Sequence, residues 1–324
     1  RIVDGRLDAE WDQRLDGVTF ERVDPVGLDP AFTPHPIAAL NVAMTQDVLQ
    51  IRIADGANVE RPILIRHIGG GAAPSFSQIR VLVGAGAATT VIETIEGDGA
   101  FASSLSAIEA GEGARVDRVL LQETDATVVR HGYLAARLGR DALFSQTSLS
   151  TGGKLSRQET SIACAASGAS VALASAALAG DDRHADFTSH IRFLKEACET
   201  RQIHKGVARD RGRLVFQGKF HVERPAQKTD AQMTANALLL SDMAEANHKP
   251  ELEIYADDVE CAHGSTAGAL DDEALFYLRQ RGLSEHVARA LLIEAFVGAA
   301  LDAAPSDAIA DILRGRIRAW LEAS

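Results

Sequence analysis

Cys261 and His263 are the residues best placed to do chemistry, because they stand two positions apart in a strand-like segment, residues 249–268. On an extended strand, side chains two positions apart leave the same face, about 6 to 7 Å from each other. A thiolate and a neutral imidazole so placed can bind a soft metal such as iron or zinc, or hold a sulfur atom beside it. Metal clusters usually take four protein donors, so either the site is incomplete or a second chain completes it.

Other side chains with ligand chemistry have simpler interpretations. Cys261 itself could be only a small buried residue. Asp257, Asp258 and Glu260 flank the pair and could bind iron, but charges near a strand edge usually stay solvated and discourage unwanted pairing. Cys164 and Cys198 have no His or Cys close to them in the sequence, so we interpret both as packed thiols.

The histidines cluster without a metal-binding spacing. Six of the ten lie in one stretch: His184, His190, His204, His221, His248 and His263. No pair has the helical H-x-x-x-H spacing or the H-x-E context of a hydrolytic zinc site. We therefore predict that most of them are surface histidines or hydrogen-bonded core histidines. No P-loop, nucleophile elbow or dinucleotide fingerprint is present, which argues against an ATPase or a dehydrogenase.

Composition excludes several classes of protein. The formal net charge is -12, and no run of Lys or Arg supplies the basic patch that nucleic-acid binding needs. No apolar window of 18 residues occurs, and the N-terminus has neither the charged nor the apolar region of a signal peptide. Three cysteines are an odd number at wide spacings, which indicates reduced thiols. These features predict a soluble, cytoplasmic chain without a membrane or nucleic-acid partner.

A regular series of small-residue corners dominates the first 268 residues. Gly-Ala corners recur at a spacing of roughly 28 residues, inside the range typical of stacked repeats. They stand near positions 56, 84–87, 113, 139–142 and 168, and each is followed by an apolar strand-like run. A unit of that size without a helical pattern can form one coil of a β-solenoid. The alternative is an antiparallel sandwich, but its hairpins would more often carry Asn-Gly or Asp-Gly turns.

The chain is accordingly predicted to be mainly β with three parts. Residues 1–36 form an N-terminal strap, residues 37–268 the β-solenoid core, and residues 269–324 a C-terminal helical domain. In the helical part, Asp271, Ser284 and Ser306 each precede an amphipathic stretch and are expected to cap its helix. Helices this short need the β region or a partner protein to stay folded.

Several segments resemble the SufB/SufD family, whose members build iron–sulfur clusters. The matching segments are RQIHKGVA (201–208), VFQGK (215–219), AQKTDA (226–231), NALLLSD (236–242), KPELEIYADDV (249–259) and CAHG (261–264). Within the family the sequence is most similar to the SufD branch. Three features favour this branch: the Cys-x-His-Gly pattern, the GALD segment that leads into the first C-terminal helix, and the lack of an N-terminal cysteine cluster.

The resemblance implies a fold and a role. It implies a right-handed parallel β-helix that pairs edge to edge with SufB, while residues after Leu270 dock the ABC-type ATPase SufC. Cys261 and His263 would then share a nascent iron–sulfur cluster with SufB, transiently and without a cofactor bound tightly to the isolated chain. The chain would be a scaffold and not an enzyme, and its pairing surface could also join two copies.

Two alternatives come from other classes. A β-helix enzyme acting on polysaccharide would need aromatic platforms, whereas this chain has 2 Trp and 3 Tyr. A free-standing mononuclear metal enzyme would use the histidine-rich stretch.

Overall fold

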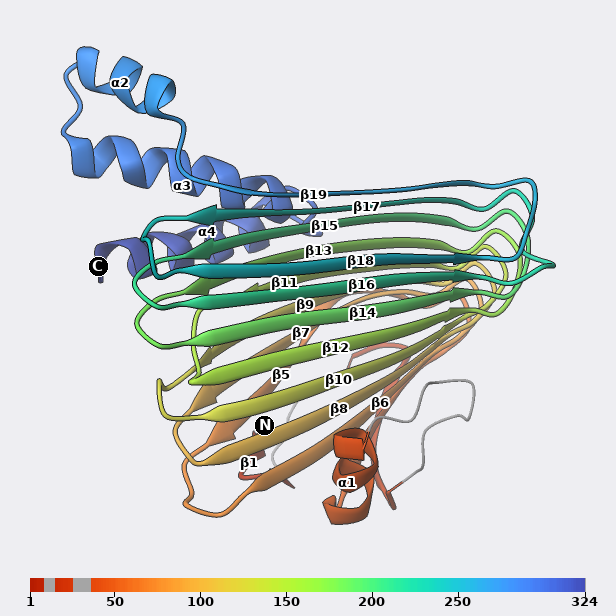
Figure 1. The fold of residues 1–324 in the computed structure, drawn as a ribbon. Coiled ribbons are helices and arrows are strands. Elements are labelled where there is room, and N and C mark those ends of the chain that lie inside the picture. Colours follow the sequence, from red (N-terminus) through yellow and green to blue (C-terminus); the bar gives the residue numbers. More distant parts are fainter. Residues whose placement is uncertain (9–14, 26–35, 324) are drawn as a thin grey trace.

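The Gly-Ala corners of the sequence become the turns of a parallel β-solenoid, which three helices follow (Figure 1). The structure is a computed structural model, and it describes every residue except 9–14, 26–35 and 324. Its strands form two facing sheets, and the chain alternates between them, so that each strand from β4 to β17 pairs with the strand two places later. The prediction of a mainly β solenoid with C-terminal helices is confirmed.

Sheet A contains, from the C-terminal end, β19 (Glu260–Gly268), β17 (Asp230–Leu239), β15 (Glu199–Ala208), β13 (Ser170–Ala179), β11 (Leu143–Ser150), β9 (Arg115–Thr124), β7 (Ala88–Gly97), β5 (Asn58–Gly69), β1 (Ile2–Val3) and β2 (Arg6–Leu7). Sheet B contains β18 (Glu245–Ile254), β16 (Arg213–Val222), β14 (His184–Phe193), β12 (Leu155–Cys164), β10 (Val129–Leu138), β8 (Phe101–Ala110), β6 (Ser75–Val83), β4 (Val48–Ile53) and β3 (Val18–Val23). The pairs from β4 to β19 are parallel, which is the arrangement of stacked coils.

The corners need a left-handed backbone and small side chains. Gly56, Gly86 and Gly113 have φ of 69°, 64° and 64°, which glycine adopts without strain. The alanine that follows the later two corners, Ala87 or Ala114, is fully buried between the coils. A larger side chain at these alanines would force the coils apart, which explains the small residues at this position.

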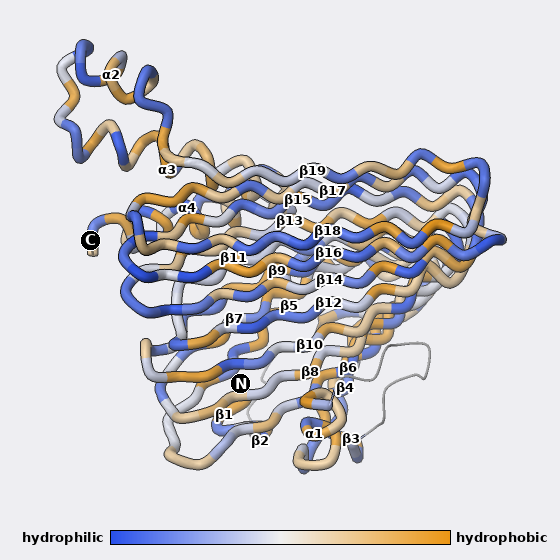
Figure 2. Tube along the Cα trace, viewed as in Figure 1, coloured by the Kyte–Doolittle hydropathy of each residue, from blue (hydrophilic) through white to orange (hydrophobic). Residues whose placement is uncertain are grey.

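Side chains alternate between the outside and the space enclosed by the two sheets, which we call the lumen. Along β7, Val91 points into the lumen and belongs to its apolar core, whereas Ile92 faces outward and packs against the cluster under the C-terminal helices. Figure 2 shows hydrophobic and hydrophilic residues alternating along many strands. The lumen also contains polar side chains. The alternation of hydrophobic and hydrophilic residues along a strand does not reveal whether such a polar residue points into the lumen or outward.

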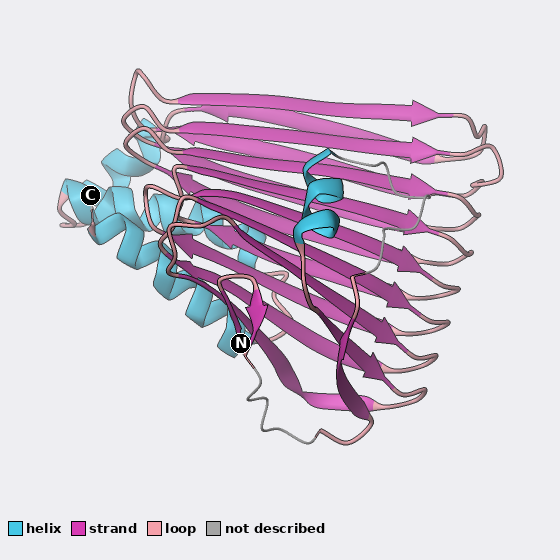
Figure 3. Ribbon diagram, turned by 90° about the horizontal axis from the view of Figure 1, so that it is seen from below, coloured by secondary structure: helices cyan, strands magenta, loops and turns pink. Residues whose placement is uncertain are grey.

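Helix α1 (Pro36–Met44) lies on the outer face of sheet B, against β6 and β8. The sequence analysis expected strands from Ile37 onward, but the segment PIAALNVAM is rich in good helix formers. Asn41 anchors it by donating to the carbonyl oxygens of Ser103 (3.0 Å) and Ser77 (3.3 Å). Helix α1 therefore covers the outer face of sheet B, whereas the C-terminal helices lie on the other side of the solenoid, against sheet A (Figure 3).

The C-terminal helices are α2 (Asp272–Gln280), α3 (Glu285–Leu301) and α4 (Asp307–Glu322). Their predicted caps are confirmed, since Asp271, Ser284 and Ser306 each accept a backbone N–H of the first turn. Helices α3 and α4 pack on the outer face of sheet A through one apolar cluster, which is built from Val119, Leu121, Leu149, Leu178, Val207, Ile293, Val297, Leu313, Ile317 and Trp320. The sheet thus supplies the support that such short helices need.

Parts of the predicted strap continue the sheets. Ile2 of β1 lies opposite His67 of β5, and Val18 of β3 lies opposite Ile53 of β4. The remainder of the strap that falls in residues 9–14 and 26–35 lies outside the described residues. Of the helices that the structure describes, none has the length and apolar character needed to cross a membrane.

Candidate functional site

Cys261 and His263 lie on β19 and face the lumen. In the parallel register, Cys261 is opposite Ala231 and His263 is opposite Met233, and both partners belong to the lumen core. Ser265 follows on the same face, opposite Ala235. The strand therefore brings the thiol and the imidazole to one face, as their spacing predicts.

The pair stands at the open end of the solenoid. Among the described residues, β19 pairs only with β17, and β18 pairs only with β16, so each has a free edge. Cys261 is half-buried and His263 is exposed. The two donors are consequently reachable from the end of the solenoid, beside two strand edges with unpaired backbone groups.

Burial governs the acidity of the thiol. Partial burial raises the pKa of Cys261, the backbone N–H of Ala231 acts in the opposite direction, and the Asp230 carboxylate raises it further. The thiol is thus mainly protonated near neutral pH, and metal binding would require it to lose that proton. A second group or the metal itself has to favour that loss.

Two more histidines occupy the lumen behind the pair. His248 of β18 reaches across to β19, with its Nδ1 2.9 Å from the Ser265 Oγ. His204 of β15 is fully buried and stacks on Phe216, with ring centroids 4.9 Å apart. Burial lowers the pKa of His204 to about 3 and also lowers the pKa of His248. Both imidazoles are therefore neutral at pH 7.

The carboxylates near the pair have other partners or face solvent. Asp258 forms an ion pair with Lys228, Asp257 is exposed, and Glu260 lies on the outer face of β19. Within the described part of the chain, no group of three or more His, Cys, Asp or Glu side chains is arranged to hold a metal ion. A metal-binding role for Cys261 and His263 therefore remains a prediction from the sequence.

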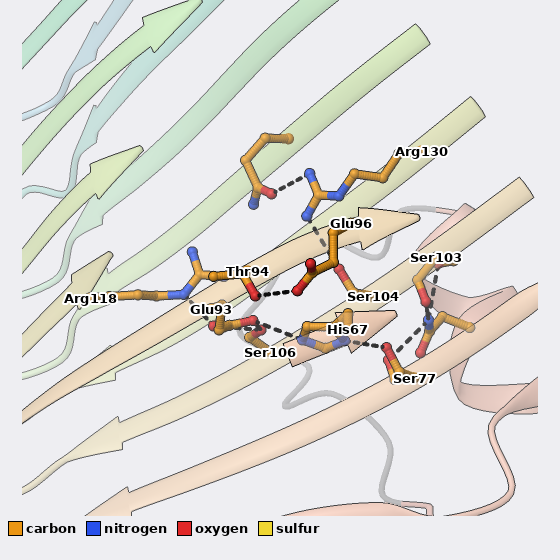
Figure 4. A network of polar contacts seen from close by, with 12 residues as sticks. His67, Ser77, Glu93, Thr94, Glu96, Ser103, Ser104, Ser106, Arg118 and Arg130 are labelled. Carbon is orange, nitrogen blue, oxygen red and sulfur yellow. Dashed lines mark hydrogen bonds and ion pairs between the residues drawn. The ribbon is translucent and has the colours of Figure 1, made fainter. Parts of the chain in front are cut away.

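A buried charged network lies in the lumen near the other end of the solenoid (Figure 4). Glu93 of β7 is fully buried, and its carboxylate accepts from Arg118 Nε (2.6 Å) and Ser106 Oγ (3.0 Å). His67 Nε2 lies 3.4 Å from the same carboxylate, and Arg118 Nη1 donates to Gln146 Oε1 (2.7 Å). Burial by itself would raise the pKa of Glu93, but Arg118 and His67 together hold that pKa well below its usual range. The carboxylate is therefore ionised inside the protein.

The sequence analysis missed this network. The network could have been found in the sequence from the coil spacing. Arg118 and Gln146 are one coil apart and lie directly opposite each other in β9 and β11. A polar residue that repeats at the coil period on the lumen face indicates a polar ladder in the lumen.

Comparison with known proteins identifies the family. The family model for the SUF system FeS cluster assembly, SufBD core domain, matches residues 66–296, which is more than half of the chain. The chain belongs to the SufB/SufD family. The resemblance found in the sequence is thereby confirmed, and the matched region includes Cys261 and His263.

Three similar proteins show how far the similarity extends. The iron–sulfur cluster assembly protein SufD of Escherichia coli is 30% identical over 98% of this chain and 77% of its own length. An iron–sulfur cluster assembly SufBD family protein of Synechocystis is 33% identical over 67% of this chain and 47% of its own length. A chloroplastic protein of Arabidopsis thaliana is 27% identical over 87% of this chain and 62% of its own length. The chain thus spans between 47% and 77% of these relatives.

Cys164 and Cys198 are both buried, as expected of packed thiols, and they also contact each other. Cys164 ends β12, and Cys198 occupies the corner before β15, where earlier coils carry Ala87 or Ala114. A hydrogen bond from the Cys164 thiol lowers the pKa of Cys198, and the same bond, together with burial, raises the pKa of Cys164. Sequence distance hid the contact, because the two residues belong to different coils.

Mild oxidation is expected to join these two thiols. Diamide can accept their two electrons and two protons, leaving a Cys164–Cys198 disulfide. The turn that covers Cys198, residues 195–197, is exposed, so only a thin layer separates the pair from solvent. Mass spectrometry after alkylation in denaturant should find one free thiol of the three, and it should be Cys261.

Matched variants sharpen that measurement. Cys261→Ser should leave the cross-link intact, whereas Cys198→Ser should abolish it. Recovery of three alkylated cysteines from the treated native chain would contradict the contact.

Proposed function

We propose that this chain is a non-enzymatic scaffold subunit that assembles iron–sulfur clusters together with SufB. The observation that carries the proposal is the position of Cys261 and His263, side by side on the lumen face of the terminal strand β19. Family membership supplies the chemistry, since the E. coli relative is named as an iron–sulfur cluster assembly protein. The cluster is cargo that the chain helps to build.

The open edges supply the pairing surface. Strands β18 and β19 each present unpaired backbone N–H and C=O groups, which another strand can satisfy. An apolar surface accompanies them, because Ile254 is 40% exposed and Tyr255 is 58% exposed next to the end of β18. A homologous solenoid that joins these edges would bring its own donors opposite Cys261 and His263. Two donors from each side would complete the four that a cluster usually takes.

The helical region supplies a second docking surface, for the ATPase SufC. Phe276 and Tyr277 of α2 are 63% and 55% exposed, and Val287 and Leu291 of α3 are 42% and 45% exposed. Helix α2 stands away from both sheets and packs on α3 (Figure 1). Large apolar side chains gathered on a protruding hairpin are typical of a protein-binding surface.

The same helices are firmly tied to sheet A, so force on them reaches the site. Lys205 lies over the Phe296 ring at 4.6 Å, and Arg209 lies over the Trp320 ring at 4.2 Å. Strand β19 runs directly into α2, with only residues 269–271 between them. ATP-driven movement of SufC subunits would therefore pull on β19 and open the interface around Cys261 and His263.

Charge substitution on α2 tests the docking surface. Phe276→Glu with Tyr277→Glu should weaken capture of SufC by about 30-fold or more, because exposed aromatic anchors dominate such interfaces. Binding is measured by titration of the purified proteins. Ile312→Glu on α4 is the control, since it removes an apolar side chain of similar exposure, 59%, from a different helix. Unchanged affinity in the α2 variant would refute the assignment.

Co-purification tests the function itself. Co-expressed SufB and SufC should be recovered with this chain, and the complex should accumulate iron and sulfide anaerobically in amounts that the chain alone does not reach. Stoichiometric metal bound tightly to the isolated chain would instead favour the mononuclear enzyme. Light scattering of the isolated chain shows whether its open edges also pair two copies.

A further inference from the structure

Arg130 of β10 is a buried charge without a counter-ion. Its side chain points into the lumen and is 2% exposed. Nη1 donates to Gln158 Oε1 (3.1 Å) and Nη2 donates to Ser104 Oγ (3.3 Å), while Nε has no hydrogen-bond partner (Figure 4). Both partners are neutral. Among the described residues, no carboxylate forms an ion pair with this guanidinium.

The neighbouring charges do not compensate it. Glu93 is already engaged by Arg118, and burial, followed by the like charge of Arg118, lowers the pKa of Arg130 to about 9, with Glu93 acting in the opposite direction more weakly. Arg130 is therefore still charged at pH 7. An ion buried without a partner costs several kcal/mol, and proteins rarely leave one so.

A cavity of about 30 Å³ lies beside the guanidinium. Its wall includes Arg130, His67, Ser77, Ser104 and Thr124. Counted in the same way, as the space open to the centre of a water-sized sphere, one water molecule needs roughly 10 to 15 Å³. The cavity therefore has room for about two waters or one small ion, and is too small for a phosphate.

Two carboxylates also line the cavity, but neither neutralises Arg130. Glu96 accepts from Arg66 Nε (2.8 Å) and Thr94 Oγ1 (3.2 Å). Asp98 stands in the turn between β7 and β8 and is exposed to solvent. The charges that act on Arg130 are those of Arg118 and Glu93.

The backbone keeps space for the guanidinium. A Cβ added to Gly132, the next lumen-facing residue of β10, would lie 2.3 Å from Arg130 Nη2 and 2.3 Å from Gln158 Oε1. Because residue 132 is glycine, the Arg130 side chain can lie along its own strand. The guanidinium is thus held in place, with Nε still unpaired.

We propose that this cavity binds one small monovalent anion, of the size of chloride or hydrosulfide, as the counter-ion of Arg130. Arg130 Nε supplies one donor. Thr124 Oγ1 already accepts from Gln122 Nε2 (2.6 Å) and Ser104 Oγ accepts from Arg130, so both hydroxyl protons are free to point at the anion. The site does not depend on the assembly role, because it lies in a different coil from Cys261.

Thermal unfolding measures the binding. The intact chain is compared in sodium chloride, sodium bromide and sodium gluconate at one ionic strength. Chloride and bromide should raise Tm by about 2 to 4 °C in a saturable way, since an anion that binds only the folded state stabilises it. Arg130→Met should lose this dependence, whereas Arg80→Met should keep it, because Arg80 lies on the outer face of β6, two strands away from β10 in the same sheet.

Anomalous diffraction from a bromide-soaked crystal of the unaltered chain gives a second readout, which does not depend on the variant folding. One bromide should lie within hydrogen-bond distance of Arg130 Nε. Anaerobic addition of sodium hydrosulfide should displace the bromide if hydrosulfide is the preferred ion, and leave it in place if chloride is. Equal Tm values in the three salts, or a cavity without bromide, would overturn the proposal.

Discussion

Changing Cys261 and His263 together to alanine is expected to lower the iron and sulfide assembled by the complex with SufB by at least about tenfold. Loss of even an indirect partner of a metal ligand usually costs 10- to 100-fold in affinity, and this variant removes both donors that the proposed function assigns to the chain. The measurement is an anaerobic count of iron and sulfide per complex. Unimpaired assembly by the double variant would refute the role of the pair.

The double variant should fold normally, so a loss of iron and sulfide would come from the missing thiol and imidazole and not from unfolding. His263 is exposed and Cys261 is half-buried at a strand edge, so their removal should change the free energy of unfolding by about 1 kcal/mol or less. Asp257→Asn with Glu260→Gln is the matched control, because it alters two flanking residues that face solvent or the outside. Assembly should be unchanged in the control, and a comparable loss would make those carboxylates ligands.

Breaking the lumen ion pair should produce the largest loss of stability. Arg118→Met leaves the fully buried Glu93 carboxylate without its arginine, and stranding one partner of a buried pair typically costs about 3 to 5 kcal/mol. Glu93→Leu should cost a similar amount, because it strands Arg118. The double variant should cost much less than the sum, since no charge is left unpaired. Urea unfolding at pH 7 measures all three.

The control is the outer-face pair on the same sheet. Arg66 and Glu96 are 2.8 Å apart, but their side chains are 42% and 37% exposed, so Arg66→Met should cost only about 0 to 1 kcal/mol. Equal losses in the free energy of unfolding for Arg118→Met and Arg66→Met would show that the buried pair stabilises the fold no more than the exposed pair does.

Acid should remove the contribution of Glu93. Its folded pKa is depressed, so its contribution to stability is fully present above the unfolded value of about 4.3 and is lost as the pH falls below it toward the folded pKa. Glu93→Gln should therefore show a shallower loss of stability below that pH than the unaltered chain. Parallel pH profiles would contradict the depressed pKa.

Repetition made the fold accessible from the sequence. Small residues such as Gly86 and Ala87 must recur wherever coils stack, and each recurrence also fixes the strand that follows. Caps such as Asp271 act over three residues, so local sequence is enough to place them. The position of Cys261 and His263 on one face followed from strand geometry alone.

The lumen contacts were harder to predict, because they join different coils. Glu93 looks like any polar residue on an alternating strand until β9 places Arg118 against it. Cys164 and Cys198 meet only because the stacking of coils brings the end of β12 near the corner before β15. Helix α1 was missed for another reason. It is only nine residues long, three of them Ala, so its periodicity is weak, and its contacts with sheet B stabilise it.

The free edges of β18 and β19 make the last coil unlike the coils before it. In a stack, each coil is stabilised by the neighbour on either side, and the terminal coil has only one. The backbone that carries Cys261 and His263 is therefore the part of the solenoid that opens most readily. A partner that adds the next coil would order the site and protect the end of the fold in one step, and its withdrawal would loosen both.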